Sequence, residues 1–303
     1  MRILVSGSSG LVGTALVPSI ASAGHRAIRL VRREPKPGEA AVRWDPSEGS
    51  LDPAPLEGID GVVHLAGENI AAGRWTAARK ERIRSSRVGS THFLSESLAR
   101  LDHPPRTLIC ASAIGYYGDR GEETLREESP PGSGFLSELC QSWEAAAEPA
   151  ARKGIRVVHL RFGVILSVKG GALAKMLPPF RLGTGGILGN GRQFMSWIGL
   201  EDAVGTIQHA LITEALRGPV NAVSPHPVTN REFTKTLGRV LARPTILPMP
   251  GVVARLLFGE MADALLLSSG RVQPARLLAA GYRFRHPDLE TALRSLLDGP
   301  RRG

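Results

Sequence analysis

The fold is decided by residues 3–13, which read Ile3-Leu4-Val5-Ser6-Gly7-Ser8-Ser9-Gly10-Leu11-Val12-Gly13. A short run that is apolar throughout is typical of a buried parallel strand. The run leads directly into three glycines spaced three apart, and residues 11–23 then place apolar side chains at helical spacing. A strand, a glycine loop and a helix in this order predict a dinucleotide-binding turn.

Each glycine of this loop has its own mechanical reason. Gly7 lets the chain turn off the strand, Gly10 lets the backbone approach a pyrophosphate, and Gly13 lets the helix pack closely against the sheet. The N–H groups at the start of the helix attract phosphates. We therefore expect the loop and the first helical turn to bind the cofactor, through Gly7, Ser8, Ser9, Gly10, Leu11, Val12 and Gly13.

The end of the second predicted strand, residues 26–31, indicates which dinucleotide is bound. An acidic residue about 20 positions past the glycines would bind the adenosine ribose and indicate NAD. This chain has Arg32 and Arg33 there, and Glu34 follows only after them. Guanidinium groups match a 2′-phosphate, so the sequence predicts NADP(H), with Arg32 as the first phosphate ligand and Arg33 as the second. The alternative is a pair of solvated arginines in an arginine-rich chain.

Length and composition exclude several classes of protein. A chain of 303 residues buries a substantial core, and 42% hydrophobic with 22% charged residues is typical of a globular protein. No apolar stretch reaches the ~18 residues of a membrane span, and the first strand leaves no room for a signal peptide. Cys110 and Cys140 have no metal-binding or redox spacing. We therefore predict a cytoplasmic protein with no metal and no membrane partner.

The net charge of +10 raises the question of nucleic acid. The basic residues are scattered, and no basic cluster is interleaved with aromatic residues, so we expect no nucleic-acid partner. A basic surface also attracts anionic cofactors and substrates. We expect a small-molecule substrate, for which this charge favours an anion.

The first half of the chain alternates strands and helices, which predicts a doubly wound parallel sheet. Further strands are expected at residues 42–44, 61–65, 107–111 and 156–162, and helices at 77–100 and 134–153. After residue 167 the pattern loosens, with prolines at 178 and 179 as punctuation and helices at 230–241 and 287–297. The prediction is an α/β Rossmann domain over residues 1–167 and a small mixed C-terminal substrate lobe over 168–303, which can return strands or helices to the first domain.

Several segments resemble a known family. Val62-Val63-His64-Leu65-Ala66-Gly67 resembles the fourth strand of extended short-chain dehydrogenase/reductases, and Ala111-Ser112-Ala113-Ile114-Gly115-Tyr116-Tyr117-Gly118-Asp119 resembles the fifth-strand segment of sugar-nucleotide epimerases. Narrower motifs are similar to the atypical "epimerase family protein" subgroup of NAD-dependent epimerase/dehydratase-like proteins. They are Gly67-Glu68-Asn69-Ile70, Arg74-Trp75-Thr76, Ser86-Arg87, Trp143-Glu144-Ala145-Ala146, Arg161-x-Gly163-Val164-Ile165-Leu166 and Phe194-Met195-Ser196-Trp197-Ile198. The resemblance covers essentially the whole chain, and residues 248–297 are similar to the subgroup's C-terminal segment.

The resemblance implies an oxidoreductase fold in which Leu65, Ala66 and Gly67 pass the cofactor's ribose and pyrophosphate. It also places the backbone of Ile165 beside the nicotinamide amide, and Asp45 follows the third strand near the adenine.

The resemblance does not extend to the acid–base groups. Extended members use a Tyr-x-x-x-Lys pair on the helix after the fifth strand and a serine or threonine at that strand's end. Alignment on Glu144 puts Leu136 and Cys140 at the tyrosine and lysine positions, and alignment on Tyr117-Gly118-Asp119 puts Ala113 at the serine position. All three groups are missing. Ser112 is one residue away and should face the other side of the strand.

The replacement candidates each have a structural alternative. Tyr116 and Tyr117 follow the fifth strand, where a phenol can donate a proton or simply pack. Glu68 is a general-base candidate or a structural carboxylate, and Asn69 is a partner for cofactor hydroxyls. Of three cations, Arg74, Lys80 and Arg87, one is expected to hold a cofactor phosphate or a substrate anion.

Two tryptophans each have two possible roles, and two histidines each have one expected role. Trp75 is either a lid residue or a core anchor, and Trp197 either shapes the substrate pocket or is buried. His64 and His159 lie in apolar strands and are expected to be satisfied core histidines.

Two functions therefore remain open. The first is an NADP-dependent, epimerase-like oxidoreductase with a rearranged acid–base set. The second is a catalytically silent NADPH-binding sensor or scaffold. We expect a monomer or a homodimer, because relatives often pair through the helices after the fourth and fifth strands.

Overall fold

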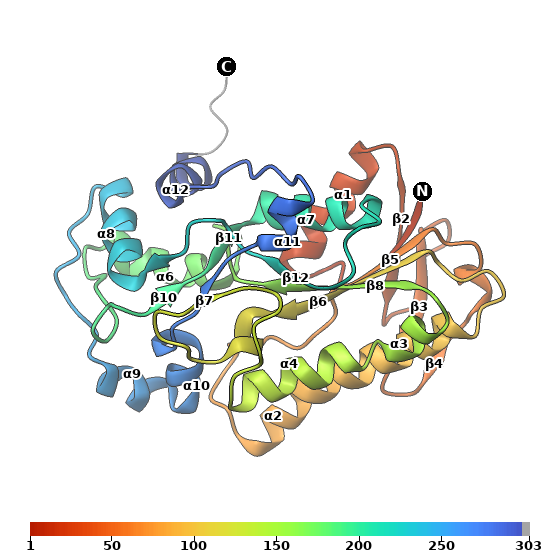
Figure 1. The fold of residues 1–303 in the computed structure, drawn as a ribbon, viewed down its shortest axis with the longest axis horizontal. Helices are drawn as coiled ribbons and strands as arrows, with labels where there is room; N and C mark the ends of the chain where they lie inside the picture. The colour runs from red at the N-terminus through yellow and green to blue at the C-terminus, as the bar shows by residue number, and fades with distance from the viewer. Residues whose placement is uncertain (299–303) are drawn as a thin grey trace.

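A central sheet of eight strands organises the computed structural model, which describes residues 1–298 (Figure 1). The strand order is β12-β8-β6-β5-β1-β2-β3-β4, and only the pairing of β3 with β4 is antiparallel. The strands are β1 (Arg2–Ser6), β2 (Arg26–Val31), β3 (Ala41–Asp45), β4 (Ser50–Leu51), β5 (Gly61–His64), β6 (Thr107–Ala113), β8 (Arg156–Phe162) and β12 (Gly218–Ala222). This confirms the predicted doubly wound sheet. The order reverses at β1, between β2 and β5, which is where such sheets bind ligands.

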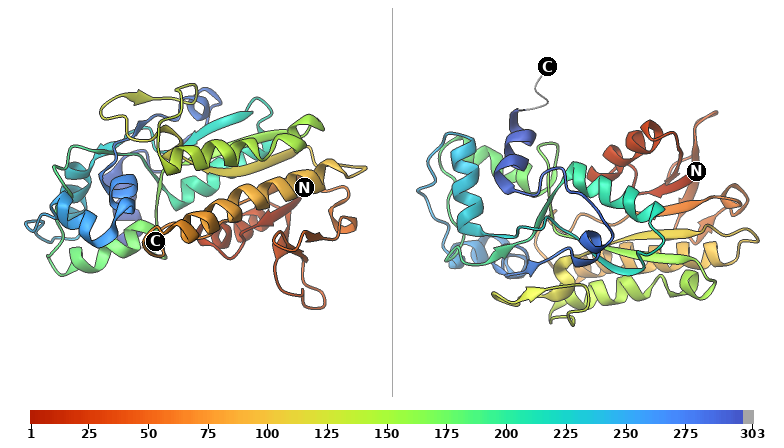
Figure 2. Two further views of the ribbon diagram at one scale, coloured as in Figure 1. Left: turned by 90° about the horizontal axis from the view of Figure 1, so that it is seen from below. Right: turned by 45° about the horizontal axis from the view of Figure 1, so that its top comes forward.

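Successive side chains of β1 point to opposite faces of the sheet, and each face is covered by a layer of helices. Ile3 and Val5 pack with α1 (Leu11–Ser22) and α7 (Leu200–Ile212), whereas Leu4 packs with the helices of the opposite face. The opposite layer holds α2 (Ala77–Arg84), the π-helical turn η2 (Ser85–Gly89), α3 (Ser90–Ala99), α4 (Phe135–Ala145) and α5 (Glu148–Arg152). Figure 2 shows the α2–α3 run lying beside α4. The helix predicted at 77–100 is thus one run with a π-turn inside it.

The C-terminal lobe, the part of the chain after β8 apart from α7 and β12, contains a core of its own, in which Trp197, Phe233 and Leu293 are buried. Its elements are β9 (Val164–Leu166), α6 (Gly171–Arg181), β10 (Phe194–Met195), β11 (Trp197–Gly199), β13 (Val228–Thr229), α8 (Asn230–Val240), α9 (Gly251–Phe258), α10 (Glu260–Ala262), η4 (Asp263–Leu267), β14 (Arg271–Val272) and α12 (Leu289–Asp298). Helix α11 (Ala275–Ala279) instead packs on β12, and its Leu277 belongs to the core of the main sheet. The remaining short elements are η1 (Ala54–Leu56), η3 (Ile114–Tyr117) and β7 (Thr124–Leu125), which pairs with β14. The predicted helices at 230–241 and 287–297 are confirmed as α8 and α12.

Two sequence expectations for the second half need correction or extension. Pro178 and Pro179 do not interrupt the chain, because α6 runs through both and ends only at Arg181. Each proline lacks a backbone N–H, so the carbonyl oxygens of Ala174 and Lys175, four residues earlier, have no helical donor. Strand β12 and helix α7 come from beyond residue 167 and complete the main sheet and its helical layer. Residues 299–303 of the predicted lobe lie outside the described residues.

Within residues 1–298, no helix combines the length and the apolarity that crossing a membrane requires.

Candidate cofactor site and active site

The glycine loop has the close approaches that a dinucleotide-binding turn requires. Gly7 has a φ of +65°, and a Cβ there would stand 2.6 Å from the carbonyl carbon of Leu65. A Cβ at Gly13 would stand 2.3 Å from the Gly7 carbonyl oxygen. Among residues 1–298, a Cβ at Gly10 would have one atom within 4 Å, that same oxygen at 3.3 Å, so the outer side of Gly10 is open. Both tight positions tolerate only glycine, and the open one leaves room for a ligand against the backbone.

The start of α1 is also free to bind an anion. Gly10 is its N-cap and supplies no side-chain acceptor, and the first turn contains no acidic residue. Ser9 and Gly10 are exposed, and Leu11 and Val12 are partly buried. The first N–H groups of the helix therefore lack the side-chain partner that usually satisfies them, which suits a phosphate.

A buried chain of hydrogen bonds fixes the loop after β5. The Ser6 hydroxyl oxygen accepts from the N–H groups of Leu65 and Ala66 at 3.1 and 3.3 Å, and it lies 2.6 Å from Nδ1 of His64. The other ring nitrogen of His64 lies 3.3 Å from the Ser90 hydroxyl. Burial lowers the pKa of His64 to about 4, so the ring is neutral at neutral pH. The expectation that His64 is a satisfied core histidine is confirmed.

The two arginines after β2 have different surroundings. The Arg33 guanidinium binds both carboxylate oxygens of Glu39, at 2.6 and 2.9 Å, and Arg29 binds the same carboxylate at 2.7 Å. Arg32 is exposed and, over residues 1–298, makes no side-chain hydrogen bond or ion pair. Its charge contributes to the lowered pKa of Asp45, for which hydrogen bonds from Ser47 are the main cause. Arg32 is thus the cation that stands open beside the loop.

The cations after β5 are also distinguished by their partners. Arg74 donates to the carbonyl oxygens of Leu256 and Leu257 at the end of α9, and Lys80 lies 2.7 Å from a carboxylate oxygen of Glu260. Arg74, in the loop after β5, and Lys80, in α2, therefore both contact the segment of α9 and α10.

Arg87 is different from these two. It donates to the carbonyl oxygens of Ile83 and Glu68 at 3.3 and 3.0 Å, lies over the ring of Trp143, and forms no ion pair in the described chain. Its Cζ would be 3.2 Å from a Cβ on Gly67. Desolvation lowers its pKa, which leaves it charged. Of the three cations, Arg87 is the one that faces the β5 loop without a carboxylate.

A buried ionic network occupies the ends of β6 and β8. The Arg161 guanidinium binds the two carboxylate oxygens of Glu144 at 2.7 and 2.8 Å, and Ser112 donates to the same carboxylate at 2.7 Å. Arg161 also donates to the Tyr117 hydroxyl at 3.0 Å, and that hydroxyl donates to Asn221 at 2.7 Å. The hydroxyl groups of the predicted candidates Ser112 and Tyr117 are thus both hydrogen-bonded within the protein. Burial raises the pKa of Tyr117 to about 12.

Tyr116 is the tyrosine that keeps a free hydroxyl. Its ring is partly exposed and lies 3.4 Å from the guanidinium carbon of Arg161, and its hydroxyl makes no hydrogen bond within the described residues. Tyr116 is therefore the candidate proton donor that the geometry leaves available.

The three positions to which the resemblance assigns the acid–base groups are Ala113, Leu136 and Cys140, and they are packed. The backbone of Ala113 is within hydrogen-bond reach of the Cys140 thiol, and burial raises the pKa of that thiol to about 12. A Cβ on Gly115 would stand 3.2 Å from the Cβ of Leu136. The fold therefore brings these positions together, with no titrating group at neutral pH among them.

The remaining predicted residues have mainly structural contacts. Glu68 pairs with Arg79 and Arg82 at 3.3 and 3.6 Å, which opposes a role as a base. Trp75 donates to the Ile70 carbonyl and packs edge-on against Phe135.

Three more of the predicted residues also make mainly structural contacts. Trp197 is fully buried and donates to the His226 carbonyl, which supports the core alternative. Ile165 is partly buried in β9, paired with β11. Asn69 accepts from the N–H of Ala71 and so stabilises a turn.

Sequence reasoning missed part of the buried network. Glu127 accepts from the N–H groups of Asn221 and Arg276 through one oxygen, while its other oxygen is buried without a partner in the described chain. The same is true of Nδ1 of His159, so the expectation of a satisfied histidine is wrong there. The signal for the network was Arg161, a charged residue near the carboxyl end of a strand whose last three residues are buried.

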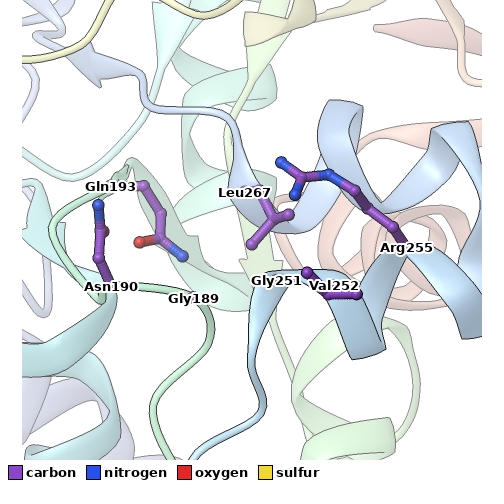
Figure 3. Close-up of a pocket in the computed structure, with 7 residues that line it drawn as sticks. All are labelled: Gly189, Asn190, Gln193, Gly251, Val252, Arg255 and Leu267. Carbon is purple, nitrogen blue, oxygen red and sulfur yellow. The ribbon is translucent and has the colours of Figure 1, made fainter.

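A cavity of about 350 Å³ lies in the C-terminal lobe between the segment before β10, α9 and η4 (Figure 3). It is lined by Gly189, Asn190, Gln193, Gly251, Val252, Arg255 and Leu267. None of the predicted site residues lines it. Residues 1–298 contain no group of three or more His, Cys, Asp or Glu side chains suited to a metal ion.

The fold and the glycine loop define a protein with a Rossmann-type dinucleotide-binding domain. The model of the NAD dependent epimerase/dehydratase family matches residues 3–222, and a domain of unknown function, DUF1731, matches residues 249–296. The chain belongs to the NAD-dependent epimerase/dehydratase family, which confirms the resemblance. It is 46% identical over 291 residues to epimerase family protein Mb2239 of Mycobacterium bovis, and the match covers 96% of each chain. It is 40% identical over 301 residues to epimerase family protein SDR39U1 of Mus musculus, and that match covers 98% of this chain and 100% of the mouse protein.

Solved structures agree with the fold. A crystal structure of human epimerase family protein SDR39U1 with NADPH is 36% identical and superposes with a TM-score of 0.91 over 98% of this chain and 99% of that one. A UDP-N-acetylglucosamine 4-epimerase from Bacillus cereus, 18% identical, superposes with a TM-score of 0.76 over 98% of each chain and shows the same fold.

Proposed function

We propose that this chain binds NADPH at the C-terminal edge of its sheet and acts as an oxidoreductase on a small carbonyl compound. The observation that supports NADPH most directly is Arg32, an exposed guanidinium without a partner at the position that selects between the two dinucleotides. The open side of Gly10 and the uncapped start of α1 fit the pyrophosphate. The NADPH of the similar human structure supports the same cofactor.

Arg87 and the loop after β5 complete the proposed site. The loop of Leu65, Ala66 and Gly67 is held against Gly7 by Ser6, so its backbone is fixed where ribose and pyrophosphate pass. We assign the Arg87 cation to the cofactor or to an anionic group of the substrate, because over residues 1–298 its hydrogen bonds go to carbonyl oxygens and it forms no ion pair.

Bound NADPH supplies a hydride, and the chain must supply the matching proton. In our proposal the Tyr116 hydroxyl donates that proton to the carbonyl oxygen of the substrate, and solvent returns it to the phenolate. The Arg161 guanidinium carbon lies 3.4 Å from the centroid of the Tyr116 ring and so holds the ring in position. Glu144 and the buried network hold Arg161 in that position.

The second candidate function is a catalytically silent NADPH-binding sensor or scaffold. It is favoured by the apolar residues at the three usual acid–base positions and by the internal bonds of Ser112 and Tyr117. An enzyme oxidises NADPH when it is given a carbonyl substrate, and Tyr116→Phe removes that activity without removing NADPH binding. A sensor leaves NADPH intact with every compound tested and binds a protein partner differently with and without the cofactor.

The cofactor proposal is tested by titrating the chain with NADPH and NADH and following nicotinamide fluorescence. Loss of a charge-assisted contact to phosphate corresponds to about a 10- to 100-fold weaker Kd, so Arg32→Ala should lower NADPH affinity by that factor and leave NADH unchanged. Arg33→Ala is the matched control and should have a smaller effect, because Glu39 already holds that guanidinium. Equal binding of the two cofactors, or equal losses in both variants, would overturn the assignment.

A further inference from the structure

Helix α9 presents an apolar face to solvent. The exposed fractions of Val252 and Leu256 are 73% and 74%, and those of Val253 and Leu257 are 42% and 51%. The members of each pair are four residues apart, so all four side chains share one side of the helix. Ala254, on the other side, is fully buried. In Figure 1, α9 lies at the end of the molecule opposite β3 and β4.

Further exposed apolar side chains lie in the segment that precedes α9 and just after α6. Ile246 and Leu247 precede the helix and are 72% and 53% exposed, and Leu182, just after α6, is 79% exposed. The two segments touch, since a Cβ on Gly183 would stand 3.4 Å from Pro244. We call this surface the α9 patch, and it consists of Leu182, Ile246, Leu247, Val252, Val253, Leu256 and Leu257. The patch contains seven of the twelve large apolar side chains that are exposed in the described chain, so the exposure is concentrated rather than scattered.

Basic side chains border the patch. Arg243 donates to the backbone carbonyl of Arg181 at 2.9 Å, which holds these two exposed arginines together next to Leu182. The nearby carboxylates are already neutralised, because Asp263 pairs with Arg255 at 2.8 Å and Glu260 pairs with Lys80. The border is therefore net positive, in a chain whose formal charge is +10.

We propose that the α9 patch docks on the surface of an anionic lipid bilayer. An apolar helix face with an arginine border is the composition of a segment that lies in the membrane interface, where the arginine stems allow the charged groups to reach the phosphates. The prediction of no membrane partner rested on the absence of a spanning stretch, and docking on the surface needs none. This inference is independent of the proposed cofactor chemistry.

Two observations favour a bilayer over a protein partner. The patch is built only from valine, leucine and isoleucine, whereas the energetic centres of protein interfaces are enriched in tryptophan, tyrosine and arginine and poor in leucine and valine. A second copy of the chain would bring the same positive border against itself, which opposes self-association through this face. Anionic headgroups complement the border, and acyl chains cover the aliphatic side chains.

The test is co-sedimentation of the full chain with large vesicles, either of phosphatidylcholine alone or of an equimolar mixture with phosphatidylglycerol. We expect pelleting with the anionic vesicles that decreases as salt is raised. The variant Val252→Ser/Leu256→Ser should lower the vesicle partition coefficient at least about tenfold, because it removes the two most exposed side chains of α9 from the interface. Ile212→Ser, 66% exposed at the end of α7, is the matched control and should bind as the wild type does.

Three outcomes would overturn the proposal. They are absence of pelleting with anionic vesicles, an unchanged partition coefficient in the double variant, and an equal loss in Ile212→Ser. Sizing by light scattering covers self-association, and a dimer that disappears in the double variant without any vesicle binding would assign the patch to a second copy instead. Because both replaced α9 side chains are exposed, circular dichroism should show an unchanged fold, which separates a loss of binding from a loss of structure.

Discussion

Replacing Glu144 by glutamine should lower the free energy of unfolding by about 3–5 kcal/mol, the usual cost of breaking one side of a buried ion pair. The magnitude follows from the contacts. Glu144 accepts two bonds from Arg161 and one from Ser112, and the side chains of the pair are only 13% and 3% exposed. A glutamine keeps the shape and one acceptor oxygen, but it turns N–H donors toward donors and leaves the guanidinium buried without a counter-charge.

The assay is equilibrium unfolding in urea followed by far-ultraviolet circular dichroism, with the change in midpoint converted at a common slope. Glu148→Gln is the control on the same side of the sheet. Its pair with Arg152, at 3.0 Å, has side chains 55% and 78% exposed, so we expect at most about 0.5 kcal/mol. If the two variants lose similar stability, the network at the strand ends does not hold the fold as we argue, and the support it gives to Tyr116 fails with it.

Three further predictions address the site. Tyr117→Phe should destabilise the chain by about 1–2 kcal/mol in urea because it removes two buried hydrogen bonds, whereas Tyr116→Phe should cost less than half of that; the reverse order would contradict the burial described above. Gly13→Ala should abolish NADPH binding or folding, since its Cβ would stand 2.3 Å from a carbonyl oxygen, while Gly10→Ala should still fold and only weaken NADPH in the fluorescence titration. His64 has a folded-state pKa of about 4, below its unfolded value near 6.5, so the unfolded state binds the extra proton as the pH falls below 6.5. The free energy of unfolding should therefore decrease between pH 6.5 and 4, by an amount on the order of 3 kcal/mol. A His64→Asn variant should lose that pH dependence.

The Rossmann half of the fold was predictable because its signals are local. An apolar run, three spaced glycines and two arginines at a strand end each have one physical reason, and all stand within the first 33 residues. The strand predicted at 156–162 has the bounds of β8, since Gly154 and Gly163 frame the segment on both sides.

The rest depended on contacts that no local pattern contains. Glu39 forms an ion pair with Arg33 and leaves Arg32 free, and no local sequence pattern identifies that ion pair. The same holds for Tyr116 and Tyr117, which are adjacent in the chain but differ in burial because Asn221 and Arg161 approach only one hydroxyl. Strand β12 was missed because its pairing with β8 joins segments about 60 residues apart.

The place of Cys140 beside Arg87 bears on how this chain can change over generations. The Arg87 cation lies close enough to the Cys140 thiol to influence its pKa. A lysine introduced at position 140 would set an ammonium against a mostly buried guanidinium, and this repulsion would oppose the substitution. Removing Arg87 first would relieve the repulsion, but that step by itself would weaken the proposed cofactor contact. Each of the two positions therefore restricts the substitutions that are open to the other.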